Sequence, residues 1–458
     1  MARTRREGAS ALELRIEGLT HQGDGVGRHE GLAVFVPGAI PGDRVLAEVW
    51  DRRKNYVIAR LVKLLDPSPD RVESPCPSFS SCGGCALLQM RYSAQLKWKK
   101  QLVIDALERI GGIRQPPVAD VVPAPKVLNY RNKVVLPVVR RGNRVHIGAY
   151  ARKSHEVVGS EDCLLHRPEL NQLLHVLVGI IHEMDYTTYN EGTGKGIMRY
   201  ALGRCAVSTG QIMAGVVTAV KKLPKASVFA SRIVEALPRV TTVVQNINQE
   251  PGNIVLGEET KTILGNGYIE DELKPPGWPG LQFRISATSF YQVNPDQAAV
   301  CYGYILDFVK GCSAVLDTYC GIGTITLFLA KQAELVVGIE EVPQAVRDAK
   351  RNALLNRLDN VHFVCGMVER ELPKLLGQGI RPDAIVLDPP RAGVAEQVLK
   401  AVINARPRRL CYMSCYPPTL ARDLKVLLEG GYELEGVQPV DMFPQTIHVE
   451  AIAYLKGK

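Results

Sequence analysis

Short apolar runs alternate with helical patterns through the last third of the chain. One apolar run, residues 314–316, leads into a tight turn that carries glycines at 321 and 323 and then into an apolar helical stretch. A second run, residues 335–339, ends in Glu340. Strands that alternate with helices in this way predict a parallel, doubly wound sheet. We therefore expect an α/β Rossmann-like domain over residues 281–458.

The first part of the chain has a different pattern. Residues 12–65 contain strands of four to eight residues separated by glycine and proline turns, which predicts a small β-barrel. A proline-rich break at residues 65–71 ends it, so a first domain is expected over residues 1–66. Between this break and the proline-rich stretch at 273–280, basic helices and strands predict a central α+β domain, residues 67–280.

The glycine turn is the first candidate for ligand binding. Glycines let a backbone approach a ligand closely, and an acidic residue such as Glu340 at the tip of the second strand is typical of a site that binds a ribose diol. The turn carries only G-x-G, which suits a nucleoside without a pyrophosphate; the alternative is an ordinary α/β turn with no ligand. Asp388 ends another buried strand before two prolines, and Gln292 precedes a helix for which Asn294 is the expected N-cap.

Charge and cysteine content narrow the classes of protein. The 458 residues carry a formal net charge of +9 and a pI near 8.9, which favours a polyanionic partner, although a basic excess of this size is often only solvated surface. Eleven cysteines, an odd number, without an export signal predict a reducing, cytoplasmic location. No apolar run approaches the ~20 residues of a membrane span.

Basic side chains gather in two stretches that are candidates for contacts with nucleic-acid phosphates, although each could be only a solvated face. In the barrel, Tyr56 lies among them and could stack on a base. The barrel set is Arg28, Arg44, Arg52, Arg53, Lys54, Arg60 and Lys63. The central set is Arg131, Lys133, Arg140, Arg141, Arg144, Arg152 and Lys153.

Three cysteines within ten residues give the strongest signal for a metal centre. Cys76, Cys82 and Cys85 have C-x5-C-x2-C spacing, and Cys163 is the candidate for a fourth ligand. Four cysteines fit tetrahedral zinc or an iron–sulfur cluster. The three-plus-one pattern favours the cluster, and buried cysteines without a ligand are the remaining alternative.

Cys415 lies where a strand gives way to a proline-stiffened turn and a helix expected to be capped by Thr419. A lone cysteine is more often a core residue, but this position suits a chemical role better. A helix N-terminus lowers a thiol pKa. Cys320 and Cys411 are the competing cysteines, and the mid-strand position of Cys411 predicts a core residue. Glu450, on a late strand, is a candidate base, although a lone glutamate of this kind is more often a solvated carboxylate.

At these residues the chain resembles the bacterial RNA (uracil-5-)-methyltransferases, specifically the iron–sulfur type that acts on 23S ribosomal RNA. The resemblance covers essentially the whole length: the N-terminal barrel is similar to an OB-like TRAM domain, and SCYPPTLARD and FPQTIHVE are similar to the two catalytic segments. DTYCGIGT and FPQTIHVE resemble the Gram-positive branch most closely. Tyr416, Pro418 and Ile447 depart from the commoner residues, which could affect substrate choice.

The resemblance implies roles for particular residues. Cys415 would be the nucleophile that adds to carbon 6 of uracil, and Glu450 the base that removes the proton from carbon 5. A four-iron four-sulfur cluster would be held by Cys76, Cys82, Cys85 and Cys163. S-adenosylmethionine would be bound by Gln292, Tyr319, Glu340 and Asp388.

Three alternative functions compete with methylation of a uridine in 23S ribosomal RNA. Transfer RNA is the runner-up substrate, although such enzymes usually lack the barrel and the cysteine cluster. An exocyclic-amine methyltransferase is suggested by D-P-P, but those enzymes normally carry an aromatic residue where this chain has Arg391. A catalytically silent iron–sulfur RNA-binding protein is the non-enzymatic alternative. We expect a monomer whose partner is an unstacked uridine of ribosomal RNA.

Overall fold

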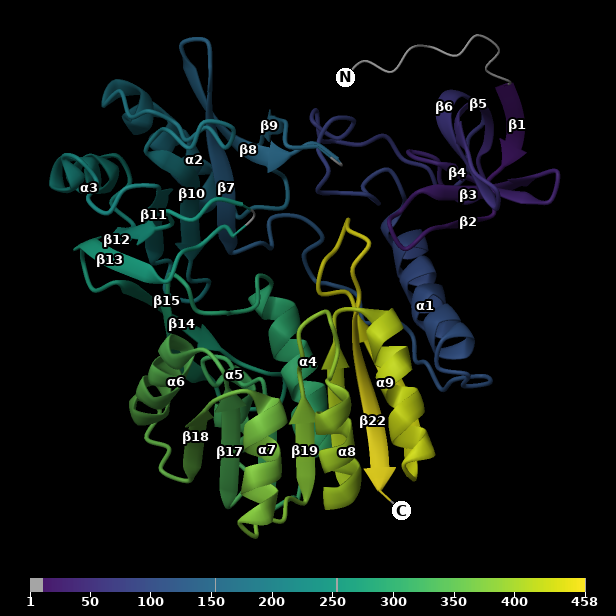
Figure 1. Cartoon of the computed structure of the whole chain (residues 1–458), viewed down its shortest axis with the longest axis vertical. Coiled ribbons are helices and arrows are strands. Elements are labelled where there is room, and N and C mark those ends of the chain that lie inside the picture. The colour runs from purple at the N-terminus through teal and green to yellow at the C-terminus, as the bar shows by residue number, and fades with distance from the viewer. Residues whose placement is uncertain (1–10, 153, 253, 458) are drawn as a thin grey trace.

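The computed structural model describes residues 11–152, 154–252 and 254–457. Lys153 and the basic residues before Ala11 lie outside the described residues. Figure 1 shows two upper lobes, the N-terminal β-domain and the central domain, above a lower α/β layer formed by the C-terminal part of the chain. No helix in the described ranges is long and apolar enough to cross a membrane.

The N-terminal lobe is a six-stranded sheet in the order β1-β5-β6-β4-β3-β2. Alternate residues of the first strand point inward, so that Leu12 and Leu14 are buried while their neighbours are exposed. The expected small β-domain is therefore confirmed. Its strands are β1 (Ala11–Arg15), β2 (Gly18–Leu19), β3 (Gly25–His29), β4 (Leu32–Val36), β5 (Arg44–Arg52) and β6 (Tyr56–Asp66).

The central lobe is built on a seven-stranded mixed sheet in the order β13-β12-β11-β10-β7-β8-β9. The apolar faces of its two helices bury Leu173, Leu177 and Phe229 against the sheet. The elements are β7 (Lys133–Arg141), β8 (Arg144–Tyr150), β9 (Val157–Gly159), α2 (Pro168–Glu183), β10 (Met198–Cys205), β11 (Ile212–Thr218), α3 (Ala226–Ala236), β12 (Val240–Ile247) and β13 (Glu259–Leu264).

The C-terminal layer is a seven-stranded sheet in the order β18-β17-β16-β19-β20-β22-β21, in which the first five strands are parallel and β22 runs antiparallel to β20. The expected doubly wound sheet is confirmed. Its strands are β16 (Ala314–Thr318), β17 (Leu335–Glu340), β18 (Val361–Cys365), β19 (Ala384–Leu387), β20 (Arg409–Ser414), β21 (Tyr432–Val440) and β22 (Glu450–Gly457). Its helices are α4 (Pro295–Phe308), α5 (Thr324–Leu329), α6 (Pro343–Leu355), α7 (Val368–Gly377), α8 (Glu396–Ala405) and α9 (Pro417–Glu429).

Segments from the central part of the sequence complete this layer. The helix α1 (Tyr92–Arg109) places Val103 and Leu107 in the same apolar core as Leu424 of α9. The strands β14 (Tyr268–Leu273) and β15 (Leu281–Ser286) pair with each other, so the expected division at residue 280 falls inside a hairpin. Their inward residues belong to the core of the α/β layer.

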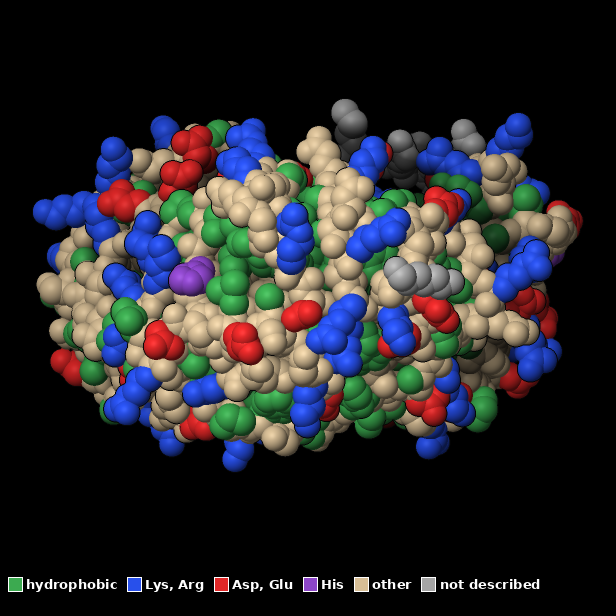
Figure 2. Space-filling view, turned by 90° about the horizontal axis from the view of Figure 1, so that it is seen from below, with side chains coloured by type: hydrophobic (Ala, Val, Ile, Leu, Met, Phe, Trp, Pro, Cys, Tyr) green, Lys and Arg blue, Asp and Glu red, His purple; other side chains and the backbone are tan. Residues whose placement is uncertain are grey.

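Charge is mixed rather than concentrated on the face away from the upper lobes. Figure 2 shows Lys and Arg side chains interspersed with Asp and Glu there. In the barrel set, Arg28, Arg44, Arg52 and Arg53 each pair with an acidic neighbour. The two expected basic stretches therefore do not act as unbroken patches of free charge.

Candidate active site

The carboxyl ends of β16, β17, β19 and β20 meet at one edge of the C-terminal sheet. Strand order reverses between β16 and β19, and ligands of doubly wound sheets bind at such a switch point. The antiparallel strand β22 begins at the same edge. β22 is antiparallel to β20, and their register pairs Ser414 with Ala451. Cys415, which follows Ser414, therefore lies beside Glu450, which precedes Ala451.

Four ionisable groups interact around Cys415. Burial, followed by the charge of Glu450, raises the pKa of the Cys415 thiol to about 11, while Arg391 opposes this shift by charge and by a hydrogen bond. Burial and the neighbouring Asp388 raise the pKa of Glu450 well above its usual value. The site thus holds a thiol, a carboxyl group whose pKa is raised, and a cation that favours the thiolate.

Asp388 lies between these groups and the glycine turn. The residue is partly exposed, yet its carboxyl group is surrounded by enough protein that burial raises its pKa to about 7. Its charge in turn raises the pKa values of Glu450 and Cys415. A carboxyl group so placed can accept a hydrogen bond from a ligand at the strand tips.

The glycine turn is shaped by its backbone and by Glu340. Gly321 and Gly323 have φ values of 57° and 83°, in the left-handed region that favours glycine. The Glu340 carboxylate accepts hydrogen bonds from the backbone N–H groups of Gly321 (3.0 Å) and Val342 (2.8 Å). A Cβ atom at Gly321 would meet nothing within 4 Å, so the turn opens onto free space there.

Two polar groups at this turn are buried without partners among the described residues. Tyr319 adopts a left-handed φ of 65°, which is uncommon for a residue with a side chain and is found at functional sites, and its hydroxyl group is one of the unpartnered groups. The other is Oδ1 of Asp317, whose Oδ2 accepts a hydrogen bond from Thr326 (2.6 Å). Buried polar groups normally have partners, so these two atoms point to a ligand.

Gln292 lies at the junction between the central sheet and α4. Its backbone carbonyl accepts a hydrogen bond from the Asn132 side chain (3.3 Å), next to the start of β7. Asn294 caps α4 as expected, through its side chain and the N–H group of Gln297. These bonds fix the segment that carries Gln292 beside the edge where the strands end.

Three residues near this edge were not predicted as site residues. Asp317 lies near the end of the buried strand β16, just before the glycine turn, and that position was the available signal. Arg391 and His448 give no such signal, because they meet only in the fold, where Arg391 donates a hydrogen bond to the ring of His448 (3.1 Å). Burial and the charge of Arg391 lower the pKa of His448 to about 4, so its ring is neutral and accepts this bond.

The expected cap of α9 is wrong. The helix begins at Pro417, because proline suits the first positions of a helix. Its N-cap is Tyr416, whose side chain makes no capping hydrogen bond. Thr419 lies inside the first turn, where its hydroxyl group donates to the carbonyl oxygens of Tyr416 (3.1 Å) and Arg391 (3.2 Å). It therefore ties the loop of Arg391 to the turn after Cys415. Cys411 is fully buried in mid-strand.

The four cysteines of the expected metal centre converge, although they are not arranged around one ion. Burial, followed by the charges of Cys163, Cys82 and Cys76, raises the pKa of Cys85 to about 12. Within the described part of the chain, no group of three or more His, Cys, Asp or Glu side chains is placed to hold a single metal ion. The four thiols are therefore close enough for their charges to interact.

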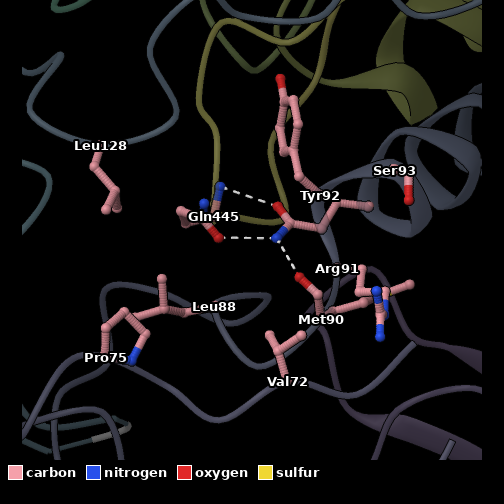
Figure 3. A pocket seen from close by; sticks show the side chains of 10 residues that line it. Val72, Pro75, Leu88, Met90, Arg91, Tyr92, Ser93, Leu128 and Gln445 are labelled. Atoms are coloured by element: carbon pink, nitrogen blue, oxygen red, sulfur yellow. Dashed lines mark hydrogen bonds between the residues drawn. The ribbon is translucent and has the colours of Figure 1, made fainter. Parts of the chain in front are cut away.

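A buried clamp holds the loop between β21 and β22 that leads to Glu450. Gln445 of this loop, which is labelled in Figure 3, is hydrogen-bonded to Gln95 of α1. Gln95 donates from Nε2 to Oε1 of Gln445 (2.8 Å) and accepts from the Gln445 N–H group (3.2 Å). One turn further along α1, Lys99 donates to Asp441 (2.5 Å) and to the Phe443 carbonyl (3.0 Å).

Breaking the Lys99–Asp441 pair should destabilise the protein. Both side chains are fully buried, so Lys99→Met leaves the Asp441 charge without compensation, at a cost of about 3–5 kcal/mol. The exposed neighbour on the same helix, Lys97→Met, should change the free energy of unfolding by less than about 0.5 kcal/mol. Urea unfolding of both variants measures the difference, and equal stabilities would contradict the clamp.

Comparisons with known proteins agree with this geometry. Residues 245–458 match the family described as tRNA (Uracil-5-)-methyltransferase, and residues 5–62 match the TRAM domain. The chain is 43% identical to an uncharacterised RNA methyltransferase of Halalkalibacterium halodurans, covering 98% of this chain and 97% of that one. It is 41% identical to a counterpart in Listeria innocua, over 98% of each.

A solved structure extends the similarity to three dimensions. The tRNA (uracil-54, C5)-methyltransferase of Pyrococcus abyssi, in complex with S-adenosyl-L-homocysteine, is 27% identical with a TM-score of 0.77. The match covers 97% of this chain and 100% of the Pyrococcus chain.

Proposed function

This chain belongs to the RNA (uracil-5-)-methyltransferases that carry a TRAM domain, and we propose that it methylates carbon 5 of a uridine in 23S ribosomal RNA. The observation that carries the chemistry is the pairing of Cys415 with Glu450 at the sheet edge where Asp388 and the glycine turn meet. The choice of 23S RNA is supported by the barrel and the four converging cysteines, through the resemblance described above.

The proposed reaction uses a thiolate because carbon 5 of uracil is a weak nucleophile. The Cys415 thiolate adds to carbon 6, and the electron pair of the ring then makes carbon 5 nucleophilic toward a methyl donor. Glu450 takes the proton from carbon 5, and the carbon–sulfur bond breaks to restore the ring and the thiolate. Arg391 assists the first step because it stabilises the thiolate.

The glycine turn is the proposed site of S-adenosylmethionine, which supplies an electrophilic methyl group when bound. The fit rests on the open space at Gly321 and on the unpartnered hydroxyl group of Tyr319. We assign Glu340, Asp388 and Gln292 to the same site. Glu340 also shapes the turn itself through Gly321.

We propose that Cys76, Cys82, Cys85 and Cys163 hold a four-iron four-sulfur cluster. The assignment is supported by the convergence of four thiols, which influence one another's ionisation, from the cysteine-rich loop and the segment after β9. The N–H group of Gly84 lies 3.4 Å from the Cys82 sulfur, and such hydrogen bonds are typical of cluster ligands. The cluster would join the cysteine-rich loop to the segment after β9.

The cluster assignment predicts a spectroscopic result. Protein purified without oxygen should contain about four iron atoms per chain and absorb visible light. Cys85→Ser should lose both, whereas Cys365→Ser, at an exposed cysteine, should lose neither. Stoichiometric zinc in place of iron would contradict the assignment.

Transfer RNA is the second candidate substrate, because the Pyrococcus protein of similar fold is a tRNA methyltransferase. Transfer of labelled methyl groups to 23S transcripts and to tRNA transcripts, followed by mass mapping, separates the two. We expect 5-methyluridine in the 23S transcript. Exclusive labelling of tRNA would overturn the choice of substrate but not the chemistry.

A further inference from the structure

A second pocket lies on the central sheet, apart from the catalytic edge. Its volume is about 240 Å³, below the range of about 300–1,000 Å³ that is usual for drug-sized ligands, so it suits one small ring system. The walls are largely aromatic: Tyr150 of β8, Tyr200 of β10, and Tyr189 and His155 from two loops.

Arg199, the neighbour of Tyr200, gives this pocket a built polar wall. Its side chain is only 4% exposed, and NH1 donates to the carbonyl oxygens of Asn248 (2.9 Å) and Glu250 (2.6 Å). The guanidinium group lies 4.5 Å from the centre of the Tyr189 ring. Its Nε is buried with no hydrogen-bond partner among the described residues. A buried donor fixed in this way lacks an acceptor, which a ligand would supply.

The remaining polar groups of the pocket offer both donors and acceptors. Burial and a hydrogen bond with Tyr200 raise the pKa of Tyr150, so the Tyr150 hydroxyl group is neutral. Asn190 and Glu191 line the rim, where Glu191 pairs with His155 (3.4 Å). Aromatic and arginine planes beside mixed hydrogen-bonding groups are the means by which proteins bind unstacked RNA bases.

The pocket is also placed to receive RNA that is bound at the catalytic edge. β7 begins at Lys133, next to Asn132, which bonds to Gln292. Pro137 lies four residues further along β7, about 13 Å from Lys133 at ~3.3 Å per residue. Pro137 pairs with Tyr200 of the pocket. An open hollow of about 600 Å³ shares Tyr150 and His155 with the pocket and continues to Gly83 and Gly84 of the cysteine-rich loop.

We propose that this pocket binds one unstacked base of the RNA substrate, a few nucleotides from the methylated uridine. The inference rests on the proposed function, since it assumes that the substrate is RNA. Tyr189 forms the stacking wall, and the Arg199 Nε donates to an acceptor on the edge of the base. The pocket adds affinity and register without taking part in methyl transfer.

The test compares RNA affinity and turnover in matched variants. Tyr189→Ala should weaken equilibrium binding of a 23S transcript by about 5- to 150-fold, the factor expected for one stacked base. It should raise the KM for RNA similarly while kcat changes less than about twofold. Tyr189→Phe, which keeps the ring, should bind within about twofold of the wild type. Tyr268→Ala removes a comparable Tyr–Arg stack elsewhere (4.8 Å, with Arg284) and should also bind normally.

Binding is measured without S-adenosylmethionine, so its outcome is independent of methyl transfer. Wild-type protein that binds the transcript but never methylates RNA would refute the proposed function and leave the pocket standing. Tyr189→Ala protein that binds as tightly as wild type, or a loss of binding shared equally by Tyr268→Ala, overturns the pocket.

Discussion

Cys415→Ala should abolish methyl transfer to RNA, with a loss of roughly 10⁴-fold or more, because removing the nucleophile of a covalent mechanism costs on the order of 10⁶-fold in a well-studied hydrolase. The expected loss is in kcat, since the thiol contributes little to RNA binding. Initial rates with labelled S-adenosylmethionine and saturating transcript measure it. Cys365→Ala, at an exposed cysteine, is the matched control and should retain full activity.

The pH dependence tests the same thiol in another way. The pKa of Cys415 is raised to about 11, so only a small fraction is thiolate at neutral pH. We therefore expect kcat/KM to rise from neutral to alkaline pH as the thiolate fraction grows. Arg391 lowers this pKa, so Arg391→Met should shift the rise to higher pH. A profile that falls over this range, or that is unchanged in Arg391→Met, would argue against a thiolate stabilised by Arg391.

Glu450→Gln should block the step after methyl transfer. A positioned base contributes about 10²–10⁴-fold, and without one the proton on carbon 5 remains, so the methylated RNA should stay attached to Cys415. Denaturing gels should show a protein–RNA adduct that carries the labelled methyl group. A fast Glu450→Gln enzyme, or one that forms no adduct, would show that another group removes the proton.

Measurement of the free energy of unfolding separates a catalytic defect of Glu450→Gln from misfolding. Burial raises the pKa of Glu450 well above its usual value in the folded protein, so the folded state binds a proton that the unfolded chain has released. The wild type should therefore lose stability as pH rises from about 4.5 toward the folded pKa. Glu450→Gln removes the ionising group and should weaken this pH dependence without lowering the free energy of unfolding.

The periodic parts of the sequence predicted most of the fold. The C-terminal strands are visible in the sequence as continuous apolar runs between helices. The barrel strands are visible because inward and outward residues alternate. The strand β10 shows no such continuous apolar run because it carries Arg199 and Arg204, although all eight of its residues are buried. Some of their donors are met by backbone carbonyl groups far away in sequence, such as those of Asn248 and Ser289, which no local pattern reveals.

The residues of the candidate site likewise fall into those that the sequence marks and those that only the fold reveals. Cys415 and Asp388 are marked by the ends of apolar strands. Glu450 can be recognised as a site residue only from the fold, because the antiparallel register of β22 and β20 places it beside Cys415. The clamp from α1 was equally hidden, since Lys99 and Asp441 are 342 residues apart.

The central claim is that sulfur at position 415 bonds to a uracil ring, and a transcript containing 5-fluorouridine tests it most directly. Fluorine at carbon 5 cannot leave as a proton does, so the methylated adduct should accumulate. Protease digestion and mass spectrometry should then find one fluorinated, methylated nucleotide on the peptide that contains Cys415. An adduct on any other residue, or rapid methyl transfer to ordinary uridine with no adduct on the fluorinated transcript, would contradict the account.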